Sequence, residues 1–95
     1  MEEEELIKSA LENNLEAKNE IYEKYKYIID ILIKKYRNIT SHLGIDKHEL
    51  EQEAMYAFSD ALHSFNEKKN VKLSTFLSVC IDRRIRKVIK KYSGE

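Results

Sequence analysis

Hydrophobic residues recur every three or four positions along most of the chain, which is the spacing of one buried face on an α-helix. Within residues 15–37 the recurring positions are Ile21, Tyr25, Ile28, Ile29, Leu32 and Tyr36. Within residues 47–65 they are Leu50, Ala54, Ala57, Phe58, Ala61, Leu62 and Phe65. Within residues 75–92 they are Phe76, Val79, Cys80, Ile85, Val88 and Ile89. The pattern predicts three amphipathic helices that share one core.

Polar stretches predict where these helices end. The pair Asn13-Asn14 favours a turn, so we expect a first helix at residues 3–12 and a long one at residues 15–37. Residues 38–45, which contain Thr, Ser and Gly, predict a loop, and residues 66–72 predict a polar connector.

Two side chains predict helix starts. Asp46, with Glu49 three positions later, is typical of a capping box at the start of the helix over residues 47–65. Ser74 predicts the N-cap of the last helix. The expected fold is all-α, a compact bundle of about four helices. It forms a single domain over residues 1–92, and residues 93–95 begin a linker or tail.

Composition agrees with a helical domain and excludes several classes of protein. The 95 residues include no proline and two glycines, and 42% are hydrophobic and 36% charged. No apolar run approaches the roughly 18 residues of a membrane span, and the acidic start is unlike a signal peptide. We therefore expect a cytoplasmic protein without a membrane partner. The single cysteine, Cys80, excludes an internal disulfide and a cysteine-rich metal site.

Charge is divided unevenly along the chain although the net charge is +0. Residues 1–66 hold eight Lys and Arg against fourteen Asp and Glu, a net charge of −6, whereas residues 67–95 hold nine against three, a net charge of +6. Residues 83–91 contain six cations and no acid. This asymmetry suggests two partners of different polarity, one of them nucleic acid. The alternative is a solvated helix face, because the negative half of the chain prevents a basic field over the whole protein.

Catalytic chemistry has little support in the sequence. The three histidines are scattered, and the two glycines form no phosphate-binding loop. Asp60 and His63 share a helix face, as in di-metal helix bundles, but a second carboxylate–histidine pair is missing. We therefore expect no enzyme activity, no metal and no cofactor.

An ordered series of motifs occupies residues 49–89. The segment Glu49-Leu50-Glu51-Gln52-Glu53-Ala54 is followed by an apolar helix ending at Phe65, a charged loop, the turn Leu73-Ser74-Thr75-Phe76 and a cationic helix. This series resembles region 2 of bacterial sigma-70 family transcription factors, in which D-L-x-Q-E-[AG] precedes F-S-T-Y. The cysteine before Ile81 is similar to alternative factors of the sporulation sigma-H type. The resemblance implies that fold, with binding to core RNA polymerase and to the promoter −10 element.

The resemblance implies a polymerase-binding surface on the helix over residues 47–65. In the family this segment binds the clamp helices of the β′ subunit through polar and acidic side chains. Gln52 and Glu53 match the family pattern, and Glu49 replaces its Asp. Met55, Tyr56 and Ser59 fall on family contact positions but differ in type. The implied polymerase-binding residues are Glu49, Gln52, Glu53, Tyr56 and Ser59. The alternative is a solvated outer face of a bundle helix.

The resemblance also implies a surface that contacts the non-template strand of the −10 element. The implied DNA-binding residues are Lys72, Thr75, Phe76, Arg83, Arg84, Arg86, Lys87 and Lys90. Arg83 and Arg86 fall where primary factors carry base-reading residues, and arginine can bond guanine bidentately. The alternative is contact with phosphates only, which positions DNA without reading its sequence. Asp82 replaces a family arginine.

Several departures from the family pattern keep a second function open. Val71 and Leu73 replace aromatics of primary factors, and Val79-Cys80 replaces a Trp-Trp pair, so intrinsic DNA melting should be weak. The alternative is a helical polymerase-binding regulator or adaptor that does not itself melt DNA; a helix bundle unrelated to transcription is a third hypothesis.

Family factors carry a region 4, which the 95 residues lack. We therefore expect an excised domain or a second protein that supplies region 4. An anti-sigma factor is a further partner that the resemblance allows.

Overall fold

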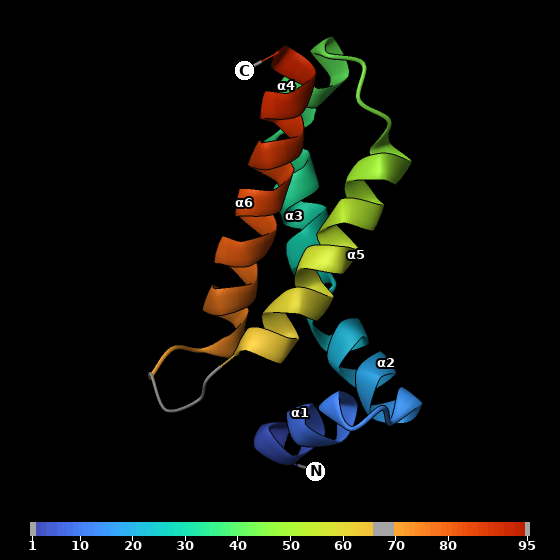
Figure 1. The fold of residues 1–95 in the computed structure, drawn as a ribbon, viewed down its shortest axis with the longest axis vertical. Helices are drawn as coiled ribbons and strands as arrows, with labels where there is room; N and C mark the ends of the chain where they lie inside the picture. Colours follow the sequence, from blue (N-terminus) through green and yellow to red (C-terminus); the bar gives the residue numbers. More distant parts are fainter. Residues whose placement is uncertain (1, 66–69, 95) are drawn as a thin grey trace.

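Six α-helices and no strand make up residues 2–65 and 70–94, the part of the chain that the computed structural model describes (Figure 1). The helices are α1 (Glu3–Leu11), α2 (Leu15–Tyr25), α3 (Tyr27–Lys35), α4 (Arg37–His42), α5 (Lys47–Ser64) and α6 (Leu73–Ser93). Helices α5 and α6 pack side by side and both contact α3, while α1 packs on α2 at the N-terminal end of the bundle. The all-α fold predicted from the sequence is confirmed. No helix among these residues is long and apolar enough to cross a membrane.

The long helix predicted over residues 15–37 is divided into α2 and α3, and a further helix, α4, follows. At the first break Ile29 N donates to Lys26 O at 3.0 Å, an i to i−3 bond that tightens the turn. The loop predicted over residues 38–45 is wrong, because residues 38–42 are helical. The Thr40 hydroxyl is satisfied inside the helix, where it donates to Arg37 O at 3.2 Å. The helix ends at His42, and Gly44 follows in the turn with a φ of 71°, a left-handed conformation that favours glycine.

The predicted helix starts are confirmed at two sites and wrong at a third. Asn14 caps α2 by accepting a bond from Ala17 N at 3.2 Å, and Asn13 adopts a φ of 69° in the turn before it. Asp46 caps α5 by accepting a bond from His48 N at 3.0 Å. Ser74 does not cap α6, because that helix begins one residue earlier, at the buried Leu73.

The predicted connector over residues 66–72 falls partly on residues 66–69, which lie outside the described residues. Residues 70–72 are not helical, and Asn70 has a φ of 55°.

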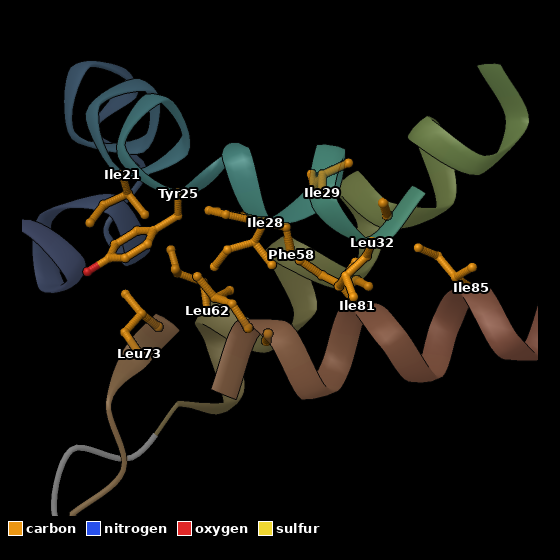
Figure 2. Packing of buried hydrophobic residues seen from close by; sticks show 14 of the residues in the cluster. Ile21, Tyr25, Ile28, Ile29, Leu32, Phe58, Leu62, Leu73, Ile81 and Ile85 are labelled. Atoms are coloured by element: carbon orange, nitrogen blue, oxygen red, sulfur yellow. The ribbon is translucent and has the colours of Figure 1, made fainter. Parts of the chain in front are cut away.

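The core of the bundle is formed by apolar side chains from α2, α3, α5 and α6, which converge as Figure 2 shows. The apolar stripe predicted for α5 is buried from Leu50 to Leu62, and Phe65 packs against it. The stripe predicted for α6 is confirmed in part: Ile85 and Val88 are buried, and Phe76, Cys80 and Ile89 pack against the core. Val79 is wrong, because it is 45% exposed, and the stripe missed Leu77 and Ile81, which are 0% exposed. Residues four apart in α6, which include Leu77, Ile81 and Ile85, therefore form the buried face and leave Val79 with the cations on the outer face.

Candidate functional site on α5 and α6

The outer face of α5 carries a line of exposed polar side chains, which we call the α5 crest. It consists of Gln52, Tyr56 and Ser59, spaced so that they follow one face opposite the buried residues. Tyr56 is 57% exposed, and none of these three side chains makes a hydrogen bond or ion pair within residues 2–65 and 70–94. The crest presents an aromatic ring and polar groups to solvent.

The two predicted polymerase-binding carboxylates, Glu49 and Glu53, lie on a different edge of α5, facing α6. Glu53 Oε1 accepts a bond from Arg84 Nε at 3.2 Å, and Arg84 Nη1 lies 3.6 Å from Asp60 Oδ2. Glu49 accepts a bond from the Tyr92 hydroxyl, and this bond raises the pKa of Tyr92. The predicted polymerase-binding residues are therefore divided between an open crest and an edge already bonded to α6.

The predicted DNA-binding cations of α6 also fall into two groups. Arg83, Lys87 and Lys90 are exposed on the outer face, at spacings of four and three residues. No carboxylate among the described residues forms an ion pair with these three side chains. Arg84 is bound to α5 as above, and Arg86 Nε lies 2.9 Å from Asp82 Oδ2. We call Arg83, Lys87 and Lys90 the free cation row.

Asp82 links α6 to α3, a role that the sequence did not reveal. Its Oδ1 accepts bonds from the Tyr36 hydroxyl at 2.7 Å and from Lys35 Nζ at 3.4 Å. Burial alone raises the pKa of Asp82, but these bonds and the charge of Arg86 outweigh it, so the pKa lies below its ordinary value. Burial, followed by the bond to Asp82, raises the pKa of Tyr36. The cluster fixes the outer face of α6 relative to α3.

The start of α6 contains the remaining predicted DNA-binding residues. Lys72 and Thr75 are exposed, whereas Phe76 is half-buried, with its ring 5.7 Å from the ring of Phe65 and tilted by 47°. Thr75 lies beside a hollow between α3 and α6 that Tyr27 and three apolar side chains also line. The only aromatic of the predicted turn thus packs largely against the bundle.

Two hollows that sequence reasoning missed lie beside the α5 crest. The first is between α5 and the junction of α2 with α3, and the second is between α5, α2 and the end of α1. One has a volume of about 230 Å³ and the other of about 210 Å³, and both are lined by Tyr22 and Met55. The second hollow also borders Leu11 of α1 and Ser59 of the crest. The apolar Met55, outside the buried stripe of α5, was the available sequence signal for these hollows. Periodicity could not show which helix lies next to it.

Asp60 and His63, the pair considered as metal ligands in the sequence, interact with other groups in the structure. Asp60 faces Arg84, and His63 Nδ1 lies 2.9 Å from Ser59 O in its own helix. In residues 2–65 and 70–94 no group of three His, Cys, Asp or Glu side chains is arranged to hold a metal ion.

The fold and the two surfaces define a helical domain that presents a polar face on α5 and a basic face on α6 to solvent. The sequence model of the Sigma-70 region 2 family matches residues 21–94. The chain therefore belongs to the sigma-70 region 2 family, a transcription-initiation domain that binds DNA and core RNA polymerase. No curated protein and no solved structure showed significant similarity to the chain. Helix α1 and the first part of α2 precede the matched residues.

Proposed function

We propose that this domain docks on the β′ clamp helices of core RNA polymerase through the outer side of α5 and holds the promoter −10 element on the outer face of α6. The observation that carries the proposal is the adjacency of two unlike surfaces. The α5 crest and its carboxylate edge lie next to α6, whose outer face carries the free cation row. One helix pair thus offers a polar, acidic surface to a protein and a basic surface to a nucleic acid.

Polymerase docking rests on the crest first and on the carboxylate edge second. Tyr56 offers a large ring with few rotatable bonds, the kind of side chain that anchors protein interfaces. Gln52 and Ser59 offer hydrogen-bonding groups on either side of it. Glu49 and Glu53 can accept charge-assisted bonds from arginines of the partner, which fix the register of the two helices.

DNA binding rests on the free cation row first. Among residues 2–65 and 70–94, no carboxylate is paired with Arg83, Lys87 or Lys90, so these cations have none to leave there before they meet a phosphate. Arg84 and Arg86 can bind phosphates only after they leave their carboxylate partners, Glu53 for Arg84 and Asp82 for Arg86. Lys72, Thr75 and Phe76 extend the DNA-binding surface at the start of α6. Arg83 is the residue we assign to base readout, since its guanidinium is exposed and uncommitted. The −35 contacts of a complete factor are left to a further segment or a second protein.

The experiment is binding of the 95-residue domain to purified core RNA polymerase, with a Gln52→Ala, Tyr56→Ala double variant. Truncating one anchor and one neighbouring hydrogen-bonding group should weaken binding by roughly 30-fold or more. The matched control is Tyr27→Ala, Asn38→Ala, which removes an exposed tyrosine and an exposed amide elsewhere. A wild-type domain that shows no saturable binding at about tens of micromolar contradicts the proposal.

A polymerase-binding adaptor that does not melt DNA is the second candidate. Packing of Phe76 on Phe65 favours it, because base opening needs an exposed ring on which an unpaired base can stack. A fork-junction DNA carrying a fluorescent adenine analogue in the non-template strand separates the two functions. Polymerase with the domain should raise the fluorescence if the base leaves the duplex. Tight polymerase binding without that rise supports the adaptor.

A further inference from the structure

A cationic hollow, which we call the α4 hollow, lies where the end of α3, helix α4 and the start of α5 meet. Its volume is about 400 Å³, and its polar lining consists of Lys34, Arg37, Thr40, Ser41 and Lys47. Figure 1 shows these elements at the end of the bundle away from α1. None of the five side chains belongs to the α5 crest or to the free cation row, so the hollow is a separate feature of the surface.

The break between α3 and α4 brings the cations of the hollow together. Lys34 lies in the last turn of α3, and Arg37 is the first residue of α4. Within α4, Arg37, Thr40 and Ser41 are spaced at i, i+3 and i+4, so they share one face. Lys47, the first residue of α5, supplies the third cation. The arrangement depends on α4 being helical, because a helix fixes its three side chains on the side of the hollow.

The positive charge of the hollow is not neutralised within the domain. None of its three cations forms an ion pair with a carboxylate of residues 2–65 and 70–94. Asp46, directly before Lys47, uses its side chain in its own helix, where Oδ1 accepts a bond from His48 N at 3.0 Å. By contrast, Asp30 and Glu51 line the hollow between α5 and the junction of α2 with α3. Like charges around one volume repel each other, and a bound anion relieves that repulsion.

The rest of the lining supplies a hydrogen-bond donor and an apolar base. The Thr40 hydroxyl is already used, because it donates to Arg37 O at 3.2 Å. Ser41 is exposed, and its hydroxyl makes no hydrogen bond within the described ranges, so it can donate to an anion. Three buried apolar side chains complete the lining: Ile33, Ile45 and Leu50. Apolar groups on one side of an ionic contact keep water away and strengthen it.

We propose that the α4 hollow binds a small oligophosphate, a ligand with two or more linked phosphate groups, such as inorganic triphosphate or the phosphate chain of a nucleotide. Arg37 can bond phosphate oxygens bidentately, and Lys34 and Lys47 add point charges from the neighbouring helices. The volume of the hollow falls within the roughly 300–1,000 Å³ of small-molecule sites. The inference goes beyond the proposed function and does not depend on polymerase or promoter binding.

The cations of the α4 hollow are arranged differently from those of the free cation row. Members of the row follow one face of a single helix, which suits phosphates that repeat along a nucleic-acid strand. The cations of the hollow come from three helices and line one volume. A compact ligand with several adjacent negative charges can contact all three at once. The arrangement therefore favours an oligophosphate over an extended strand of DNA.

Titration calorimetry of the 95-residue domain with sodium triphosphate, in a magnesium-free buffer, tests the proposal. The wild type should bind with a dissociation constant on the order of 10–100 µM at about 0.05 M salt. Arg37→Gln, Lys47→Gln should weaken binding by about tenfold or more. The matched control, Lys8→Gln, Lys91→Gln, removes the same charge from exposed lysines outside the hollow and should weaken binding by less than about twofold. Equal losses for the two double variants, or no saturable binding by the wild type up to about 5 mM, overturn the proposal.

A second pair of variants keeps the test decisive if Arg37 or Lys47 is also needed for folding. Ser41→Glu places a carboxylate among the three cations, and Asn38→Glu adds the same charge to α4 outside the hollow. Ser41→Glu should weaken triphosphate binding by about tenfold and Asn38→Glu by less than about threefold. Circular dichroism shows that each variant is folded. Wild-type affinity of a folded Ser41→Glu variant overturns the proposal.

Two further ligands distinguish the possible sources of the phosphate chain. A nucleoside triphosphate that binds at least about threefold more tightly than inorganic triphosphate assigns a nucleotide as the ligand. Equal affinities assign the phosphate chain alone, and both results support the site. A labelled single-stranded DNA oligonucleotide is the opposing case. If Arg37→Gln, Lys47→Gln weakens DNA binding as much as triphosphate binding, the hollow is part of the DNA surface and the proposal is overturned.

Discussion

The outer faces of α5 and α6 lie next to each other but differ in whether their charged side chains are bonded within the domain. The carboxylates of α5 are bonded to α6, through Glu53 to Arg84 and Glu49 to Tyr92. The free cation row of α6 makes no such bond among the described residues. Held side chains are oriented in advance and favour binding in one register, whereas free cations adjust to a backbone of repeating phosphates. Within one helix pair, α5 is therefore suited to a specific protein contact and α6 to an adaptable nucleic-acid contact.

The largest effect concerns which side of α6 faces the core. Ile81→Ala removes a side chain that is wholly buried and should lower the free energy of unfolding by about 2–5 kcal/mol. Val79→Ala, on the outer face beside the cations, should change it by less than about 0.5 kcal/mol. Urea unfolding followed by circular dichroism measures both. A larger loss for Val79→Ala than for Ile81→Ala would mean that Val79 faces the core. Arg83, four residues on, would then also face the bundle rather than solvent, and α6 would have no outer cationic face.

The same register explains what the sequence could and could not predict of the fold. The α5 stripe was predictable because Leu50, Ala54 and Phe58 recur at the four-residue spacing of one helix face. In α6 apolar residues occur on two faces, since Val79 is apolar and exposed, so periodicity alone did not single out Leu77 and Ile81. The breaks after α2 and α3 were missed for another reason. They are changes of direction inside a continuous apolar pattern, without glycine or proline to mark them.

Of the candidate site, the sequence predicted residue types but not their partners. Gln52, Tyr56 and Lys87 were expected to be exposed polar positions of two helices, and they are exposed. The bond between Glu53 and Arg84, and the role of Asp82 on α3, depend on which helices become neighbours. Nothing in a one-dimensional pattern specifies that pairing. Three of the eight charged residues predicted for the two surfaces, Glu49, Glu53 and Arg84, therefore make bonds between helices that only the tertiary structure reveals.

Reversing two members of the free cation row tests the open half of the comparison. Arg83→Glu, Lys87→Glu should weaken binding to single-stranded DNA by more than about tenfold at about 0.1 M salt, because two phosphate contacts become repulsions. Lys8→Glu, Lys34→Glu makes the same change of net charge on exposed lysines of α1 and α3. Fluorescence anisotropy with a labelled oligonucleotide measures both. Equal losses would mean that only net charge matters and that α6 has no special place in DNA binding.

The bonds of Asp82 to Tyr36 and Lys35, which hold α6 and its free cation row against α3, can be tested by their pH dependence. Its pKa in the folded protein lies below the ordinary 3.8, so its contribution to stability is complete above about pH 5 and disappears as pH falls through the folded pKa. Asp82→Asn should therefore cost roughly 1 kcal/mol of unfolding free energy at pH 7, and the gap from wild type should begin to narrow near about pH 4 and close once the pH is below the folded pKa. Denaturant titrations at several pH values measure the gap. A gap independent of pH would show that the carboxylate charge does not hold α6 to α3.

The smallest effect separates a free arginine from a held one within a single turn of α6. Binding of single-stranded DNA loses about 0.7 from its slope of log affinity against log salt for each phosphate contact removed. Arg83→Gln should therefore flatten the slope by about 0.7, since its guanidinium meets DNA directly. Arg84→Gln should leave the slope of the isolated domain nearly unchanged, because Glu53 and Asp60 already neutralise that guanidinium. Both substitutions remove one positive charge from the same helix, so net charge cannot produce a difference between them. Equal flattening would mean that Arg84 reaches phosphate despite its carboxylates, and the distinction between the held and the free side of the helix pair would then have no consequence for DNA.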